Sequence, residues 1–204
     1  MALTTYAELL TSLGNWLNRD DLTDQLPDFI RIAESRMNRY LRVPQMELTV
    51  EQAVSDGTTA LPVDFLELRS LYIDDDPDRQ LVGVPPHELR RRYPTTTSGT
   101  PEVYAIEGQT LTFGPSPAEA EIVVINYFRE ITPLSDDNTT NWLLEDYPDA
   151  YLWGALAAAE AYAKDKEQAM MWKAQFDETL GEIMSAGRKM AAPHQLVQRP
   201  MVSN

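Results

Sequence analysis

"NWLLEDYPDAYLWGALAAAEAYAKD", residues 141–165, combines large aromatic side chains with a run of alanines and contains no cysteine, histidine, serine or arginine. Pro148 suits the first turn of a helix, where a backbone amide hydrogen is not needed. The stretch therefore predicts a helix over about residues 148–164 that is built for packing.

Two kinds of side chain on this helix favour close contact with other helices. The small residues that permit a close approach are Gly154, Ala155, Ala158, Ala159 and Ala161. Large amphipathic contact area is supplied by Trp142, Tyr147, Tyr151, Trp153 and Tyr162. Packing inside the monomer and contact with a neighbouring subunit both explain such a surface, and the sequence leaves both open.

Three further helices follow from apolar residues spaced three and four apart. The first covers about residues 5–18 and begins with the capping-box sequence Thr5-Tyr6-Ala7-Glu8. The second starts near Asp24 and ends by Val43-Pro44. The last covers about residues 166–187, and its expected buried stripe is Ala169, Trp172, Phe176, Leu180 and Ile183.

The middle of the chain is predicted to form strands. From Met46 apolar and polar residues alternate, which is typical of a half-buried strand, and Asp56-Gly57 supplies a turn for the return. Within residues 64–74 the apolar side chains switch from one face of the expected strand to the other, and a β-bulge would return them to the same face. Residues 102–108, 109–115 and 121–128 predict three more strands, the last of them apolar on both faces like a central strand.

Two segments between these strands differ in character. The sequence DDDPDRQ, residues 74–80, is expected to be an exposed loop. VPPHELRRRY, residues 84–93, predicts a short helix with Pro86 in its first turn.

This order of elements predicts an α+β fold, in which N- and C-terminal helices form an antiparallel bundle with an inserted, mostly antiparallel β lobe. The expected divisions are residues 1–44 for the N-terminal helices, 45–135 for the β lobe, 136–187 for the C-terminal helices and 188–204 for an extended tail.

Composition narrows the classes of function. The net charge of −15 argues against a ligand such as free nucleic acid, which requires a concentrated basic surface, but it suits a surface that DNA slides past. The absence of cysteine excludes thiol catalysis and thiolate metal sites and is compatible with a reducing cytoplasm. We see no secretory signal and no apolar run of about 20 residues, so an intracellular soluble product is expected.

Motifs for chemistry are missing from the sequence. His87 and His194 have no second histidine at metal-ligand spacing. The aspartates of residues 74–78 fail as a calcium loop, because Arg79 and Pro85 occupy its glycine and glutamate positions. We therefore expect no catalytic residues, no metal and no cofactor.

One basic cluster, Arg90-Arg91-Arg92, lies where the short helix should end. Cations there compensate the helix dipole, which is the ordinary interpretation. The alternative is a contact with an acidic neighbour, such as another copy of this acidic chain.

Three passages resemble the head-to-tail adaptor (connector) proteins of tailed bacteriophages. They are residues 5–43 (TYAELLTSLGNWLNRDDLTDQLPDFIRIAESRMNRYLRV), 61–74 (LPVDFLELRSLYID) and 140–165 (TNWLLEDYPDAYLWGALAAAEAYAKD). With the strands between them, the resemblance covers about residues 4–185.

This resemblance implies a structural protein of the virion neck, assembled in the cytoplasm of the host bacterium. It implies a ring, usually dodecameric, that binds the portal protein and the tail or nozzle proteins. DNA would pass through without sequence-specific binding, and no membrane would take part. The family implies no catalytic residues.

The family also implies docking on the portal partly through an extended C-terminal segment, here Arg188 to Asn204 with Leu196 and Val197 as apolar anchors. The candidate partner-binding residues are Arg90, Arg91, Arg92, His194, Leu196, Val197 and Arg199. The rival hypothesis is a monomeric acidic regulator or inhibitor that covers a basic surface of a nucleic-acid enzyme.

Overall fold

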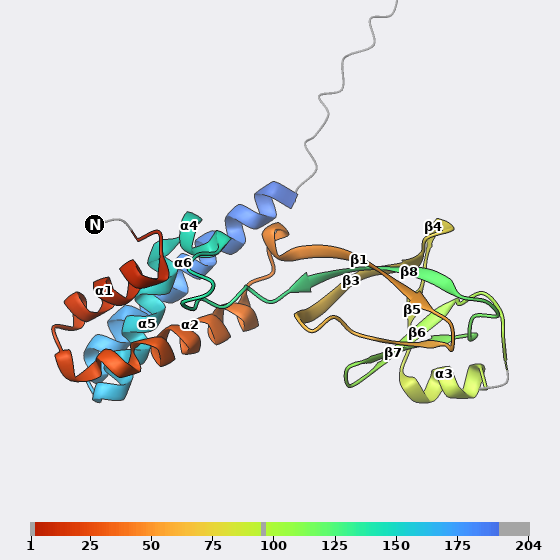
Figure 1. Cartoon of the computed structure of the whole chain (residues 1–204), viewed down its shortest axis with the longest axis horizontal. Helices are drawn as coiled ribbons and strands as arrows, with labels where there is room; N and C mark the ends of the chain where they lie inside the picture. Colours follow the sequence, from red (N-terminus) through yellow and green to blue (C-terminus); the bar gives the residue numbers. More distant parts are fainter. Residues whose placement is uncertain (1–2, 95–96, 192–204) are drawn as a thin grey trace, which may run out of the picture. The chain divides into compact units, whose positions relative to one another are not determined.

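The chain forms two compact units, which the computed structural model describes over residues 3–94 and 97–191 (Figure 1). The helical unit contains the described residues of Met1–Gln45 and Ile131–Asn204, and the strand unit is Met46–Glu130. The fold is α+β, as predicted.

The helical unit contains α1 (Tyr6–Leu17), η1 (Asp20–Gln25), α2 (Leu26–Tyr40), α4 (Trp142–Asp146), α5 (Pro148–Ala163) and α6 (Lys166–Ala191). The predicted capping box is present at the start of α1, where the Glu8 amide donates to the Thr5 hydroxyl at 3.3 Å. A short 3-10 helix, η2 (Pro44–Met46), follows α2. Its last residue, Met46, was predicted to begin a strand.

Two helix boundaries differ from the prediction. Helix α2 starts at Leu26 rather than near Asp24, because the residues before it form a separate 3-10 turn, and it ends at Tyr40. Helix α6 continues to Ala191, so residues 188–191 of the expected extended tail are helical.

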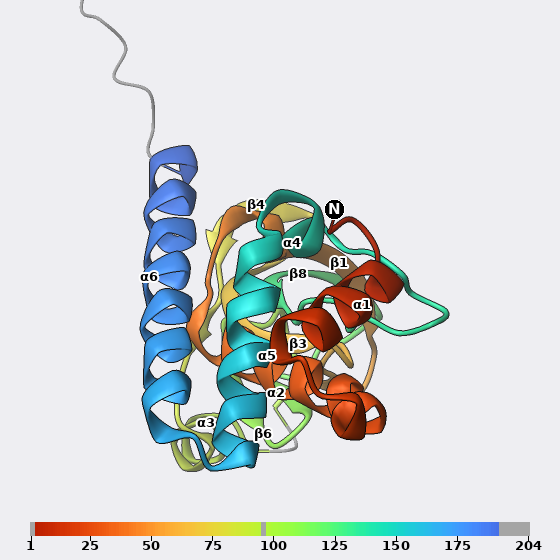
Figure 2. The same ribbon diagram turned by 90° about the vertical axis from the view of Figure 1, so that its left-hand side faces the viewer.

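Helix α5 forms the centre of the helical unit, and it lies between α1 and α6 in Figure 2. Gly154 leaves room for its neighbours, since a Cβ there would lie 2.8 Å from atoms of both Ala33 and Phe176. The small residues Ala155, Ala158 and Ala159 are also buried within the unit. Most of the small-residue surface therefore packs inside the monomer, while Ala161 and Tyr162 remain exposed.

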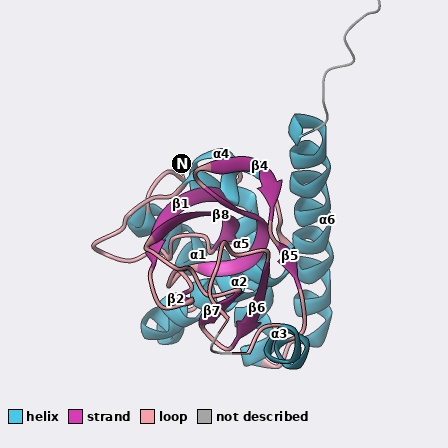
Figure 3. Cartoon of the chain, turned by 90° about the vertical axis from the view of Figure 1, so that its right-hand side faces the viewer, coloured by secondary structure: helices cyan, strands magenta, loops and turns pink. Residues whose placement is uncertain are grey.

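The strand unit contains two four-stranded sheets (Figure 3). One has the order β1 (Glu47–Val54), β8 (Glu121–Arg129), β3 (Phe65–Ile73), β4 (Asp76–Gln80). The other has the order β2 (Thr58–Ala60), β7 (Thr110–Gly114), β6 (Val103–Glu107), β5 (Val82–Gly83). Helix α3 (Pro86–Arg92) packs on β6. Strand β8 is internal to its sheet, as its apolar sequence predicted.

The two sheets share one hydrophobic core. Leu71 of β3 and Ile125 of β8 meet Leu111 and Phe113 of β7 there. Pairing of the named strands is antiparallel except between β5 and β6, and β3 contains the irregularities expected from its change of phase.

Two predictions for this unit were wrong. Residues 58–60 after the Asp56-Gly57 turn do not return along β1 but pair with β7 in the other sheet. Residues 76–80 form the edge strand β4 rather than a loop. Every side chain of β4 is exposed, so the strand carries no apolar alternation by which the sequence could reveal it.

Candidate interaction surfaces

The predicted arginine cluster lies on the last turn of α3, and its three side chains are exposed. Arg90 forms a bidentate ion pair with Glu107 of β6, in which its two terminal nitrogens lie 2.5 and 3.2 Å from the two carboxylate oxygens. The Arg92 guanidinium lies 5.8 Å from the ring centre of Tyr93. Two of the three arginines are therefore engaged by their own unit, and Arg91 is the one left facing outward without a contact of this kind among the described residues.

The other four candidate residues, His194, Leu196, Val197 and Arg199, lie outside the described residues. His87, which the sequence placed on the surface, is exposed on α3.

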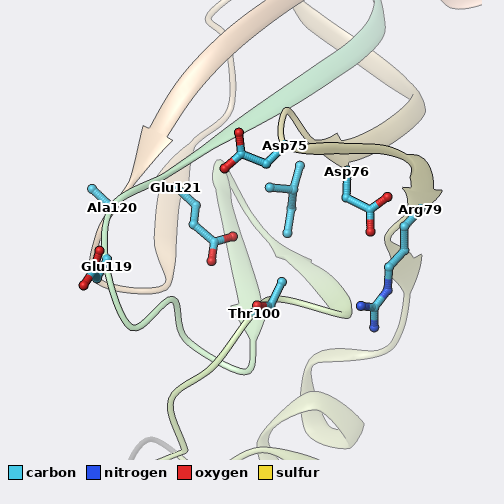
Figure 4. A pocket seen from close by; sticks show the side chains of 8 residues that line it. Asp75, Asp76, Arg79, Thr100, Glu119, Ala120 and Glu121 are labelled. Carbon is cyan, nitrogen blue, oxygen red and sulfur yellow. The ribbon is translucent and has the colours of Figure 1, made fainter.

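An acidic pocket of about 280 Å³ opens in the strand unit (Figure 4). Asp75 borders it from the turn between β3 and β4, and Asp76 borders it from the first position of β4. Glu121, the first residue of β8, and Glu119 just before that strand border it as well. Desolvation, with a smaller effect of the Asp75 charge, raises the pKa of Glu121. One oxygen of Glu121 is buried without a hydrogen-bond partner. Negative charge is therefore crowded at this edge of the sheet.

A cationic groove of about 420 Å³ lies in the helical unit. Its charged rim consists of Arg36, Lys164, Lys166 and Lys173. Its apolar lining consists of Ala157, Ala161, Ala169 and Met170. Among the residues that the structure describes, no acidic one lines this groove, although the chain has 32 acidic against 17 basic residues.

Local chain geometry concentrates cations at the rim of this groove. Lys164 ends α5 in the left-handed conformation at φ 64°, where glycine is the usual residue. Asp165 follows it and accepts a hydrogen bond from the Gln168 amide at 3.1 Å, and α6 then begins at Lys166. Two lysines thus flank one tight turn, and the intervening carboxylate is engaged by the start of the helix. Composition alone gave no sign of this groove, because α2 supplies Arg36 from more than a hundred residues away.

Three tryptophans join three helices of the same unit. Trp153 of α5 stacks on Trp172 of α6 with ring centres 5.1 Å apart. Trp16 of α1 meets both rings edge-on at 5.6 Å and is 52% exposed. The cluster attaches α1 to the other helices and leaves aromatic surface open to solvent.

Glu34 is a buried carboxyl that the sequence did not single out. It is 5% exposed, and its Oε1 accepts hydrogen bonds from the Leu134 amide at 2.8 Å and the Tyr151 hydroxyl at 3.3 Å. Asn141 donates to the same hydroxyl at 2.7 Å. Burial raises the pKa of Glu34, and the hydrogen bonds partly oppose the rise. This network fixes residues 131–141 against α2 and α5.

Within the two described stretches, no group of three or more histidine, cysteine, aspartate or glutamate side chains is arranged to hold a metal ion. Helices in the same stretches are all too short or too polar to cross a membrane.

Charged and aromatic surfaces on a two-unit scaffold are typical of proteins that bind other proteins. The family model described as SU10 adaptor protein matches residues 4–199. The chain therefore belongs to the SU10 adaptor family of phage structural proteins. Among curated proteins, none matches it.

Proposed function

We propose that this phage adaptor acts in the virion neck, where copies form a ring beneath the portal and join the head to the tail machinery. The observation that carries the proposal is the match to an adaptor family over residues 4–199. In this role the protein binds the portal, its own neighbouring copies and tail proteins, and it catalyses no reaction.

The ring gives passage to the genome without binding its sequence. A net charge of −15 supports this role, because acidic side chains on an inner wall repel phosphate and keep DNA mobile. Salt at 0.1 M screens this repulsion beyond about 10 Å. A ring whose inner wall proved to be dominated by lysine and arginine would contradict this part of the proposal.

Sedimentation tests the proposed function. Purified chain is mixed with portal-containing, DNA-filled heads that lack neck proteins, and the copies that co-sediment are counted. We expect many copies per head in a fixed ratio. Failure to co-sediment, together with binding at low stoichiometry to a nucleic-acid enzyme, would instead support the acidic inhibitor.

Docking by the C-terminal segment is tested by Leu196→Asp with Val197→Asp, which should abolish co-sedimentation because charge replaces both proposed anchors. Val63→Asp is the matched control, since Val63 is an apolar residue in the strand unit that is fully exposed. That control should co-sediment like the parent chain. Equal co-sedimentation of the tail variant would remove Leu196 and Val197 from the interface.

Arginine cluster contacts are tested separately. Arg91→Glu should weaken co-sedimentation while lowering the unfolding free energy by no more than about 1 kcal/mol, the effect of one charge at a helix end, since Arg91 makes no ion pair with a described residue. Arg90→Ala removes the exposed pair with Glu107, which is worth at most about 1 kcal/mol. If neither variant alters co-sedimentation, the cluster serves only to complement the α3 dipole.

A further inference from the structure

The cationic groove defined above is opposite in charge to the molecule that carries it. Arg36, Lys164 and Lys166 form no ion pair with any described residue, while Lys173 is paired with Asp177 one turn further along α6. Unpaired cations beside an apolar surface favour a partner that is acidic and partly apolar. The groove is therefore suited to a partner segment that carries carboxylates next to a small apolar surface.

A segment with this chemistry is present in the chain itself. The turn between β3 and β4, together with the start of β4, carries four carboxylates, those of Asp74, Asp75, Asp76 and Asp78, and all four residues are exposed. Pro77 lies among them, and its ring offers a compact apolar surface for the alanines of the groove. We call residues 74–78 the acidic turn.

The acidic turn has little compensation from its own unit. Arg79 lies beside it in Figure 4, but its guanidinium pairs with Glu102 at 3.1 Å. The Asp75 charge also disfavours ionisation of Glu121 across the acidic pocket. Cations supplied from outside would relieve this crowding of negative charge.

We infer that the cationic groove of one copy receives the acidic turn of a second copy. The inference rests on the proposed function, and it names the surfaces through which neighbouring copies recognise one another. The groove belongs to the helical unit and the acidic turn to the strand unit, so the two surfaces in contact differ. A contact between two different surfaces is head-to-tail, and it closes into a ring when the rotation between copies allows.

Charge exchange tests the contact. The groove variant carries Lys164→Glu with Lys166→Glu, and the turn variant carries Asp75→Lys with Asp76→Lys. Each alone places like charges together, so the number of copies bound per portal-containing head should fall by about tenfold or more. In a mixture, copies of the two variants that alternate have opposite charges at each of their junctions, so binding should recover. Rescue by the turn variant, without rescue by the control variant described next, supports the inference.

The matched control variant carries Glu145→Lys with Asp146→Lys, which changes two adjacent exposed carboxylates of the helical unit by the same total charge. It should not rescue the groove variant. Rescue by this control as well would overturn the inference, because it would show a response to net charge alone. Circular dichroism of each variant should match the parent chain.

Cross-linking gives an independent readout, because the chain contains no cysteine. A Lys166→Cys chain and an Asp75→Cys chain are mixed with the heads and oxidised, and the linked peptides are identified by mass spectrometry. We expect a link between residues 166 and 75 of different copies. A Val63→Cys chain in place of Asp75→Cys should give none.

Other outcomes overturn the inference in distinguishable ways. If copies bind the heads in a fixed ratio but no 75–166 link forms, the ring remains and this contact is wrong. If no copies bind at all, the proposed function fails as well. Binding of a duplex oligonucleotide or of isolated portal protein that the groove variant loses, without rescue by the turn variant, would assign the groove to that partner instead.

Discussion

Gly154 determines how closely α5 approaches its neighbours. Replacing it by alanine would normally favour a helix by about 0.5–1 kcal/mol. Here the added Cβ would lie 2.8 Å from atoms of Ala33 and Phe176, which is closer than packed carbons allow. We expect Gly154→Ala to lower the unfolding free energy by about 1–3 kcal/mol, measured by urea denaturation.

Gly181 is the control for this prediction, since nothing lies within 4 Å of a Cβ built there in α6. Gly181→Ala should stabilise the protein by about 0.5–1 kcal/mol. Equal effects of the two substitutions would show that α5 is not packed as closely as described.

Glu34 should make stability depend on pH. Its pKa in the folded protein is raised, mainly because burial disfavours the charged form. A raised folded pKa gives a stabilising contribution that is complete below the unfolded value of about 4.3 and is lost as pH rises through the folded value. Relative to Glu34→Gln, the parent chain should therefore lose unfolding free energy as pH rises from 4 to neutrality. Between the unfolded and folded pKa values of Glu34, the slope should correspond to about one proton.

Glu8 should give the opposite pH dependence of the unfolding free energy, which Glu8→Gln tests. Hydrogen bonds from Thr4 and Thr5 lower the pKa of Glu8, so its contribution is present above the unfolded pKa and lost as pH falls. Urea denaturation from pH 4 to neutrality measures the Glu34 effect, and the Glu8 effect requires the measurement to be extended below pH 4. A parallel pH dependence of the parent chain and Glu34→Gln would contradict the burial of that carboxyl.

At the scale of elements, α5 and the first half of α6 should differ in protection from hydrogen exchange. Nine residues of α5 are buried. None of residues 166–175 in α6 is itself buried, so opening this half separates the Trp153–Trp172 stack but exposes no fully buried side chain of α6. In the free chain, amides of α5 should exchange slowest and those of residues 166–175 much faster, as measured by mass spectrometry. Uniform protection along both helices would contradict the packing.

Elements with strong local signals were predictable from the sequence. The capping box predicted the start of α1, and Pro148 predicted the start of α5. Residues 121–128, which are apolar on both faces, predicted the internal strand β8. Edge strand β4 was missed because a strand without a buried face lacks the alternation that reveals strands. The partner of β2 was missed because β7, the strand with which it pairs, lies far along the chain.

The candidate surfaces were less predictable for the same reason. The arginine cluster was visible because its three residues are adjacent in sequence. The groove was not, because Arg36 and Lys173 come from different helices and meet only in the folded unit. Residues 194–199 were proposed from the resemblance to adaptors and remain a proposal.

At the scale of the whole molecule, charge is unevenly distributed. The groove and the acidic turn concentrate opposite charges on two separate units of a strongly acidic chain. Assembly through them should weaken as salt rises, because exposed charges are screened within about 10 Å at 0.1 M. Counting bound copies per head at increasing sodium chloride concentrations measures this effect. Binding that does not respond to salt would indicate an apolar interface elsewhere.

We propose above that copies of this adaptor surround the path of DNA between head and tail. Electron microscopy of the neck of mature virions, with an affinity tag on the chain to mark its position, tests this claim most directly. We expect a closed ring of tagged copies directly beneath the portal. Mature virions without the tagged chain, or with a single copy in the neck, would contradict it.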